Sequence, residues 1–247
     1  MPDGQTPSDR DPRRDLAALA RRVESCRACP RLVAWREAVA AAPRAAFIGE
    51  QYWARPLAGF GDPAARIAVV GLAPAAHGGN RTGRIFTGDR SGDWLFRALW
   101  RAGYANQQES RSRGDGLRLD GAWVTAVVRC APPENKPTNA ERDACVGYLA
   151  EELALLGEVR VVVALGSFAF QAVARLADLH PRPTFGHLAE VPLGPGARVA
   201  PGGTLLGSYH PSQRNTFTGT LTEEAFDAVF ARARVLEIPP VSALLDR

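Results

Sequence analysis

The feature that most limits the folds open to this chain is an alternation of short apolar runs with amphipathic segments. Four runs predict strands, because each is rich in Val or other apolar residues and leads into Gly or Pro. They cover residues 66–74, 122–130, 159–166 and, more weakly, 204–211. Between them, apolar residues at helical spacing predict helices over residues 91–104, 138–157 and 167–177.

Strands that alternate with helices are typical of βαβ units. We therefore expect an α/β fold, a three-layer sandwich in which helices flank a central four-stranded parallel sheet. Ligands of such folds bind in the loops that follow the carboxyl ends of the strands. Two more helices are expected before the first strand, over residues 15–25 and 31–40, and Thr138 with Glu141 predicts a capping box at the start of a helix.

The length of 247 residues suits one domain, which we expect over residues 15–238. Residues 1–14 are expected to form a disordered tail and residues 239–247 a C-terminal tail. No apolar run is long enough to span a bilayer, and the polar N-terminus lacks the apolar segment of a signal peptide. We expect a cytoplasmic protein without a membrane partner.

The charge of the chain is compatible with a nucleic-acid partner but does not require one. The formal net charge is +4, and Lys136 is the only lysine among 30 basic residues. Arginine matches phosphate oxygens with a planar fork of donors. A GC-rich genome, which would also enrich Ala, Gly and Pro, explains the same excess of arginine.

The chain contains four cysteines, and together they could form one ligand set. Cys26 and Cys29 form a CxxC pair, Cys130 ends a predicted strand, and Cys145 lies on the next predicted helix. Disulfides conflict with the expected reducing compartment. Zinc and an iron-sulfur cluster both accept four thiolates, and the wide spacing of the second pair slightly favours the cluster. Four unrelated buried thiols are the remaining alternative.

Two polar loops follow predicted strands and are the candidates for ligand binding. Residues 71–89 form a Gly-rich turn after the first strand, and residues 210–219 follow the fourth strand. The first loop has neither the Gly-Lys-Ser/Thr of a P-loop nor a GxGxxG pattern. One loop could bind a base and the other a phosphate backbone.

Four segments together resemble the uracil-DNA glycosylase superfamily, and specifically its family 5 branch, which carries an iron-sulfur cluster. They are CRACPRLVAWRE from Cys26, GLAPAAHGGNRTGRIFTGD from Gly71, VVRCAPPENKPT around Cys130 and GSYHPSQRNTFTG around His210. The resemblance extends from about Cys26 to Leu236. Taken jointly, the four segments are specific, whereas any one alone would be weak.

The resemblance implies a monomeric DNA-repair enzyme that flips uracil out of double- or single-stranded DNA and hydrolyses its N-glycosidic bond. It implies a structural 4Fe-4S cluster on Cys26, Cys29, Cys130 and Cys145. His210 would point a donor at the uracil O2, where negative charge grows as the base departs.

The resemblance also assigns residues to the base and to the DNA. Phe86 would stack on the flipped base, and Asn80 and Asn135 would hold the base edge or the attacking water. Backbone groups would line the pocket floor at Gly71, Leu72, Ala73, Pro74 and Ala75. DNA contacts would come from Ser212, Gln213, Arg214 and Asn215. Each of these side chains also has an ordinary alternative as a core, turn or surface residue.

The chain departs from the better-known branches of the superfamily at two places. Where those branches place an acidic residue or Asn to orient water, this chain has Leu72 and Ala73, and no acidic residue occurs between Gly71 and Asp89. Ala126 replaces an Asn of the related iron-sulfur branch. We therefore expect a substrate range that includes hypoxanthine. The alternatives are an iron-sulfur module that binds nucleic acid without catalysis, and an iron-sulfur redox or sensor protein.

Overall fold

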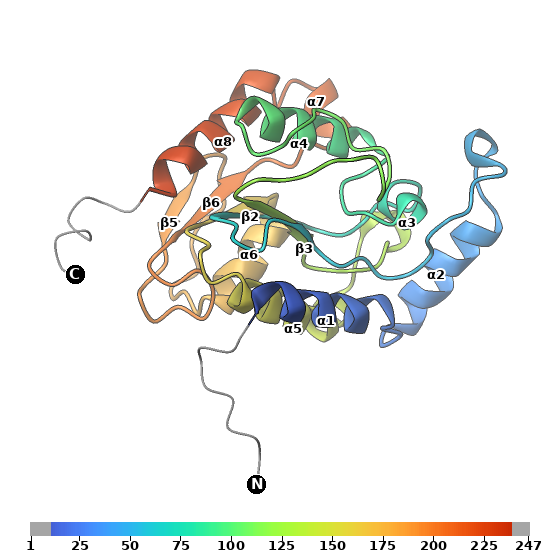
Figure 1. Ribbon diagram of the computed structural model, residues 1–247, viewed down its shortest axis with the longest axis horizontal. Coiled ribbons are helices and arrows are strands. Elements are labelled where there is room, and N and C mark those ends of the chain that lie inside the picture. The colour runs from blue at the N-terminus through green and yellow to red at the C-terminus, as the bar shows by residue number, and fades with distance from the viewer. Residues whose placement is uncertain (1–10, 239–247) are drawn as a thin grey trace, which may run out of the picture.

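The computed structural model describes residues 11–238, which form three layers around one sheet (Figure 1). The sheet has six strands in the order β1-β3-β2-β4-β6-β5. Their bounds are β1 (Phe60–Gly61), β2 (Ile67–Gly71), β3 (Ala122–Ala126), β4 (Val161–Leu165), β5 (Glu190–Pro192) and β6 (Thr204–Ser208). The four central strands are mutually parallel, and β1 and β5 add to the two edges in antiparallel orientation.

The expected α/β fold is confirmed, and the four predicted strands are the parallel centre of the sheet. The central parallel sheet has the four strands expected, and two antiparallel edge strands that were not predicted extend it. β1 has two residues and β5 has three, and neither is buried. Such short, half-exposed strands carry no apolar run that a sequence pattern could detect.

Helices cover both faces of the sheet. In chain order they are α1 (Pro12–Glu24), α2 (Pro30–Ala41), α3 (Gly79–Thr82), α4 (Arg90–Arg101), α5 (Asn139–Leu155), α6 (Ser167–Leu176), α7 (Gln213–Phe217) and α8 (Glu223–Leu236). The helices α4 and α8 pack on one face, and α1, α5 and α6 pack on the other (Figure 1). Two 3-10 turns complete the structure, η2 (Ala45–Phe47) and η3 (Pro133–Asn135).

The start of α1 corrects one expected boundary. Asp11 caps this helix by accepting a hydrogen bond from the N–H of Arg13, so residues 12–14 are helical and do not belong to a tail. The rest of the expected tails, residues 1–10 and 239–247, lies outside the described residues. At α5 the predicted capping box between Thr138 and Glu141 is present in both directions. Across residues 11–238, no helix is both long and apolar enough to cross a bilayer.

The strand order creates a crevice at the carboxyl edge of the sheet. β2 and β4 are neighbours, but the chain leaving β2 continues to α4 on one face, whereas the chain leaving β4 enters α6 on the other face. The connecting loops therefore diverge at this point. In open α/β sheets such a point is where ligands bind.

A buried ion pair fixes the end of β3 to α5. Arg129 Nη2 donates to Glu152 Oε2 over 2.6 Å, and both side chains are almost fully buried. Glu152 also accepts hydrogen bonds from the Thr125 hydroxyl, at 2.5 Å, and from the Gly59 N–H, at 3.1 Å. One carboxylate thus joins α5 to the strand β3, to the segment after it and to the segment before β1.

Replacing Glu152 with Ala should lower the free energy of unfolding by about 3–5 kcal/mol, because it leaves the Arg129 charge buried without a partner. Urea denaturation measures the change. The matched control is Glu151→Ala, since the neighbouring Glu151 pairs with Arg22 on the surface and should contribute at most about 1 kcal/mol. Equal losses in the two variants would contradict the importance of the buried pair.

Candidate active site

A cleft of about 990 Å³ opens at the carboxyl edge of the sheet. It is formed by the loops that follow β2, β3 and β6, together with one side of α2. Ten of the residues predicted for base or DNA binding line it. The first loop contributes Leu72, Ala73, Pro74, Ala75 and Phe86, and the later loops contribute Asn135, His210, Ser212, Gln213 and Arg214.

His210 lies at the end of β6 with its ring in the cleft. Its backbone carbonyl accepts hydrogen bonds from the Asn215 side chain and from the Ser212 N–H, each at 2.8 Å. Within the described chain, neither ring nitrogen has a hydrogen-bond partner. Burial lowers the pKa of His210 from 6.5 to about 4, so the imidazole is neutral at pH 7 and keeps one N–H to donate.

Phe86 faces His210 across the cleft, with ring centroids 6.0 Å apart. The ring of Phe86 lies directly on Gly71, where a Cβ atom would overlap it. Gly71 itself does not line the cleft, and its carbonyl accepts from the Val127 N–H at 3.0 Å. The cleft lining therefore begins at Leu72, and Gly71 makes room for Phe86; the predicted contact of Gly71 with the base stays a prediction.

Asn80 is also absent from the cleft, contrary to its predicted catalytic role. Its side chain is 1% exposed, and its Nδ2 donates to the carbonyl of Arg36 on α2 over 3.2 Å. Asn80 thus joins α3 to α2 behind the cleft wall. Asn135 does reach the cleft, where it is exposed at the rim in a left-handed backbone conformation with φ of 56°.

In the loop after β6, one of the four predicted DNA contacts has a different role. Gln213 and Arg214 are exposed at the cleft rim, and Ser212 caps the short helix α7 by accepting from the Asn215 N–H. Asn215 does not line the cleft, because its amide is used to hold the His210 carbonyl. Asn215 therefore positions His210, and its predicted DNA contact stays a prediction.

The structure adds an acidic group that the sequence analysis did not assign. Asp89 lines the cleft and caps α4, where its Oδ1 accepts from the Gly92 N–H over 3.0 Å. Its other oxygen lies against Gly78, and burial raises the pKa of this carboxyl. An Asp placed just before the apolar pattern of a helix is a typical N-cap, and that signal could have located it.

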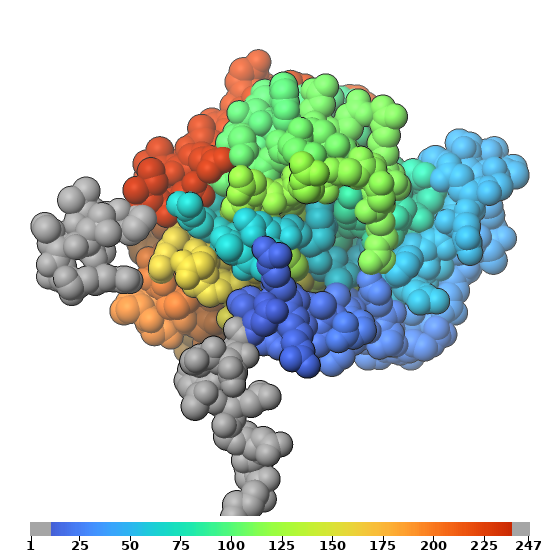
Figure 2. Space-filling view, in the orientation of Figure 1, coloured from blue at the N-terminus to red at the C-terminus, as the bar shows by residue number. Residues whose placement is uncertain are grey.

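One side of the cleft is a projecting arm made of α2 and the η2 turn. In Figure 2 the light-blue segment around residues 40–50 extends beyond the rest of the molecule. Arg81 ties the arm to the first loop: it pairs with Glu50 at 2.5 Å, lies 4.1 Å from the Phe47 ring, and donates to the His77 carbonyl. Arg44 lines the cleft from the arm and pairs with no carboxylate in residues 11–238.

All four cysteines line a second, smaller cavity on the other side of α2. Cys29 caps α2, Cys26 lies in the turn before it, Cys130 follows β3, and Cys145 lies on α5. The structure therefore brings together the four residues that the sequence spacing grouped. Among the residues that the structure describes, however, no three ligating side chains form a group able to hold a single metal ion.

The surroundings of the cysteines suit thiolates. Arg36 is buried and its Nη1 donates to Cys130 Sγ over 2.9 Å, while the Arg129 N–H donates to Cys145 Sγ over 3.3 Å. Burial raises the pKa values of the Cys130 and Cys145 thiols, that of Cys130 to about 12. Free thiols here would be protonated, and a bound metal centre would replace these protons. The donor set and its N–H groups fit an iron-sulfur cluster.

Comparison with known families identifies the family to which the chain belongs. Residues 58–234 match the model of the uracil DNA glycosylase superfamily, and this range contains both cleft loops and the whole sheet. A type-5 uracil-DNA glycosylase of Thermus thermophilus is 53% identical over 226 residues, which cover 90% of this chain and 98% of that protein. The chain belongs to the uracil-DNA glycosylase superfamily, in its type-5 branch.

Other relatives support this branch over its neighbour. A type-5 enzyme of Mycobacterium tuberculosis is 52% identical over 217 residues, covering 87% of this chain and 79% of that protein. A type-4 uracil-DNA glycosylase of Pyrobaculum aerophilum is only 29% identical over 163 residues, covering 66% of each chain. The resemblance found in the sequence motifs is therefore confirmed at the level of the family and of its branch.

The lowered pKa of His210 predicts how stability depends on pH. The unfolded chain takes up a proton near pH 6.5, whereas the folded chain does so only near pH 4. Stability from this residue is therefore complete above pH 6.5 and is lost as the pH falls toward 4. Between pH 7 and pH 5 the free energy of unfolding should fall more in the wild type than in His210→Gln, as measured by urea denaturation. Parallel pH dependence of the two proteins would contradict the burial of a neutral His210.

Proposed function

We propose that this chain is a uracil-DNA glycosylase that hydrolyses the N-glycosidic bond of a base flipped into the cleft. The observation that carries the proposal is the meeting of the superfamily's loops in one cleft, where neither ring nitrogen of His210 has a hydrogen-bond partner among residues 11–238. Family membership supports the same activity. A redox sensor gives no reason for a His210 whose nitrogens face a cleft with an apolar wall.

His210 supplies stabilisation of the leaving group in this proposal. As the glycosidic bond breaks, negative charge grows on the departing uracil, and the N–H of a neutral imidazole can donate to it. The N–H groups of Ala73 and Ala75 also have no partner among the described residues, so the pocket floor can add donors to the base. Phe86 covers one side of the base through its ring face.

Asp89 is the group that we assign to the attacking water. The sequence left this task open, since no acidic residue precedes Asp89 in the first loop. The carboxyl reaches the cleft, and burial raises its pKa, which makes the carboxylate a stronger base than an exposed Asp. Asn135, at the rim, is placed to contact the base edge or the sugar from the opposite loop.

The pocket wall supports a broad range of bases that includes hypoxanthine. Its side chains at Leu72, Ala73, Pro74, Ala75 and Phe86 are apolar, and none of them carries an amide that would select uracil. Ala126 is 1% exposed and does not line the cleft. Backbone donors and an aromatic face recognise features that many bases share. Selectivity must then arise from how easily a base leaves the duplex, which is easiest for a mispaired base.

DNA binding is assigned to the cleft rim. Arg44 on the arm, Arg90 at the start of α4 and Arg214 on α7 surround the opening from three directions. The guanidinium carbon of Arg90 lies 4.4 Å from the ring centroid of the exposed Phe217, which ends α7. Ser212 and Gln213, at the start of α7, also line the cleft. Guanidinium groups bind phosphates in a sequence-independent way, which suits an enzyme that must scan DNA.

We propose that Cys26, Cys29, Cys130 and Cys145 hold a 4Fe-4S cluster. A single zinc ion would draw four sulfurs to within about 4 Å of one another, at Zn–S bonds of about 2.3 Å. Four cysteines that share a cavity without forming such a group favour a larger centre. The cluster would supply a structural cross-link between α2, α5 and the segment after β3. We also propose that the enzyme acts as a cytoplasmic monomer, since one chain provides every group assigned above.

Purified protein should release uracil from a duplex with a U·G pair, and hypoxanthine from a matched duplex, leaving alkali-labile sites. His210→Ala should excise uracil about 10²-fold more slowly, because it loses one donor to the developing charge, while its affinity for abasic DNA stays nearly unchanged. The control Gln213→Ala should keep the rate of the chemical step. Near-normal excision by His210→Ala would remove this residue from the mechanism, and uracil release without detectable hypoxanthine release would contradict the broad pocket.

The cluster proposal predicts a brown protein with about four iron and four labile sulfide per chain. Cys145→Ala should lose visible absorbance and iron together, as measured by absorbance and metal analysis of protein purified without oxygen. The control Asp143→Ala alters the same helix on its exposed side and should keep both. A colourless wild type that contains one zinc per chain would overturn the proposal.

A further inference from the structure

Phe86 has a backbone conformation that needs support from its surroundings. Its φ is +55°, in the left-handed region that bulky residues rarely adopt. Its ring lies on Gly71, and its carbonyl lies so close to Gly92 of α4 that a side chain there would overlap it. The contacts with these two glycines leave no space for the ring or the carbonyl of Phe86 to move toward them. Neither glycine, however, has a side chain that could hold the Phe86 segment in place.

The residues on either side of Phe86 are held by a buried arginine and a distant loop. Arg84 Nε donates to the Thr87 hydroxyl over 3.2 Å, and its Nη2 donates to the Ser110 hydroxyl over 2.7 Å. The hydroxyl groups of Thr87 and Ser110 are 2.5 Å apart. Arg84, Thr87 and Ser110 are all buried, so these bonds are formed away from water.

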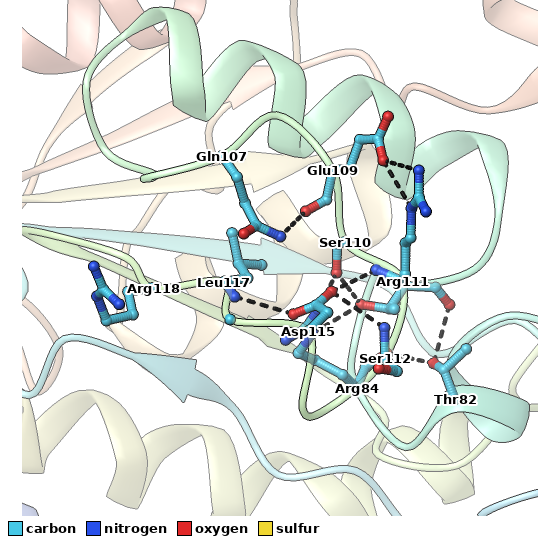
Figure 3. A network of polar contacts seen from close by, with 12 residues as sticks. Thr82, Arg84, Gln107, Glu109, Ser110, Arg111, Ser112, Asp115, Leu117 and Arg118 are labelled. Atoms are coloured by element: carbon cyan, nitrogen blue, oxygen red, sulfur yellow. Dashed lines mark hydrogen bonds and ion pairs between the residues drawn. The ribbon is translucent and has the colours of Figure 1, made fainter.

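Asp115 completes the set and fixes the loop. It pairs with Arg84 Nη2 at 2.5 Å, and it accepts from the N–H groups of Arg111, Ser112 and Leu117 (Figure 3). The Arg84 guanidinium and these N–H groups hold the pKa of Asp115 well below its usual range. The loop is therefore built around a charged carboxylate, whose Oδ2 accepts from Arg84 as well as from the N–H groups of Arg111 and Ser112.

None of these polar groups reaches the cleft. Arg84, Thr87, Ser110 and Asp115 are absent from its lining, whereas Phe86 lies in it. The loop of residues 105–117 belongs to the connection between α4 and β3, and the sequence analysis gave it no function. A buried network that ends on Arg84 and Thr87, which flank Phe86 in the chain, is placed to control that residue.

We infer that Arg84, Ser110 and Asp115 are positioning residues that hold Phe86 in its left-handed conformation and so set the stacking surface for the flipped base. The inference rests on the proposed function of Phe86 as that surface. In this proposal, the loop of residues 105–117 acts as a brace that supports the first motif. The network fixes residues 84 and 87, so that Phe86 between them keeps one backbone conformation. A misplaced ring would lower the rate of excision, because errors of about 1 Å in positioning cost up to about 10²-fold.

The first test is a double-mutant cycle with Phe86→Leu. Ser110→Ala removes the hydroxyl group between Arg84 and Thr87 and keeps the ion pair, so it should fold. In the wild-type background it should lower the single-turnover rate of uracil release about tenfold. In the Phe86→Leu background it should have almost no further effect, because the residue on which it acts is already gone. Asp115→Asn is a second variant with the same expectation.

The matched control is Glu109→Gln, which lies in the same loop and removes an exposed ion pair with Arg111. It should leave the rate unchanged. Thermal unfolding of every variant separates loss of fold from loss of positioning. Equal losses of rate with and without Phe86, or no loss from Ser110→Ala, would overturn the inference.

A second measurement does not depend on activity. In protein labelled with fluorophenylalanine, the ¹⁹F resonance of Phe86 is identified as the one of ten that Phe86→Leu removes. Ser110→Ala should shift or broaden this resonance, and Glu109→Gln should not. An unchanged resonance overturns the positioning role even in an active enzyme. A changed resonance in a protein that releases no base would instead uphold the brace and refute the proposed function.

Discussion

The parallel alignment of β3, β2, β4 and β6 is the constraint on which the rest of this structure depends. Because parallel strands end at the same edge, three loops that are up to about 140 residues apart in the chain meet over one cleft. The divergence of the chain after β2 and β4 opens the crevice between them. His210, Phe86 and Asp89 share a site for this reason.

Buried arginines then stabilise the loops that the sheet brings together. Arg129 with Glu152 fixes the end of β3 to α5, Arg84 with Asp115 braces the first loop, and Arg36 donates to Cys130 beside the cleft wall. Each guanidinium is almost fully buried and makes more than one hydrogen bond. Carboxylates compensate the charges of Arg84 and Arg129, whereas Arg36 bonds to the Cys130 sulfur and the Cys26 carbonyl. The arginine excess of this chain thus has a structural use, in addition to the phosphate contacts proposed at the cleft rim.

The helix α2 connects the two centres of the protein. One side lines the active-site cleft through the arm, and the other lines the cysteine cavity. Asn80 joins the first loop to this helix through the carbonyl of Arg36, whose side chain reaches Cys130. A cluster bound by the cysteines would therefore fix the cleft wall without taking part in the reaction.

The sequence by itself determined the α/β class, the four parallel strands, the grouping of the cysteines and ten of the residues that line the cleft, because apolar periodicity and motif spacing are local properties. Only the tertiary structure decided where side chains point. Three residues of the motifs make supporting contacts: Gly71 makes room for Phe86, Asn80 bonds to α2, and Asn215 bonds to the His210 carbonyl. Asp89, at the end of the first motif, lines the cleft. The edge strands and the Arg84–Asp115 brace also depend on contacts between distant segments. A linear pattern records which residues are present, but burial and hydrogen bonding across the fold decide which of them face the substrate.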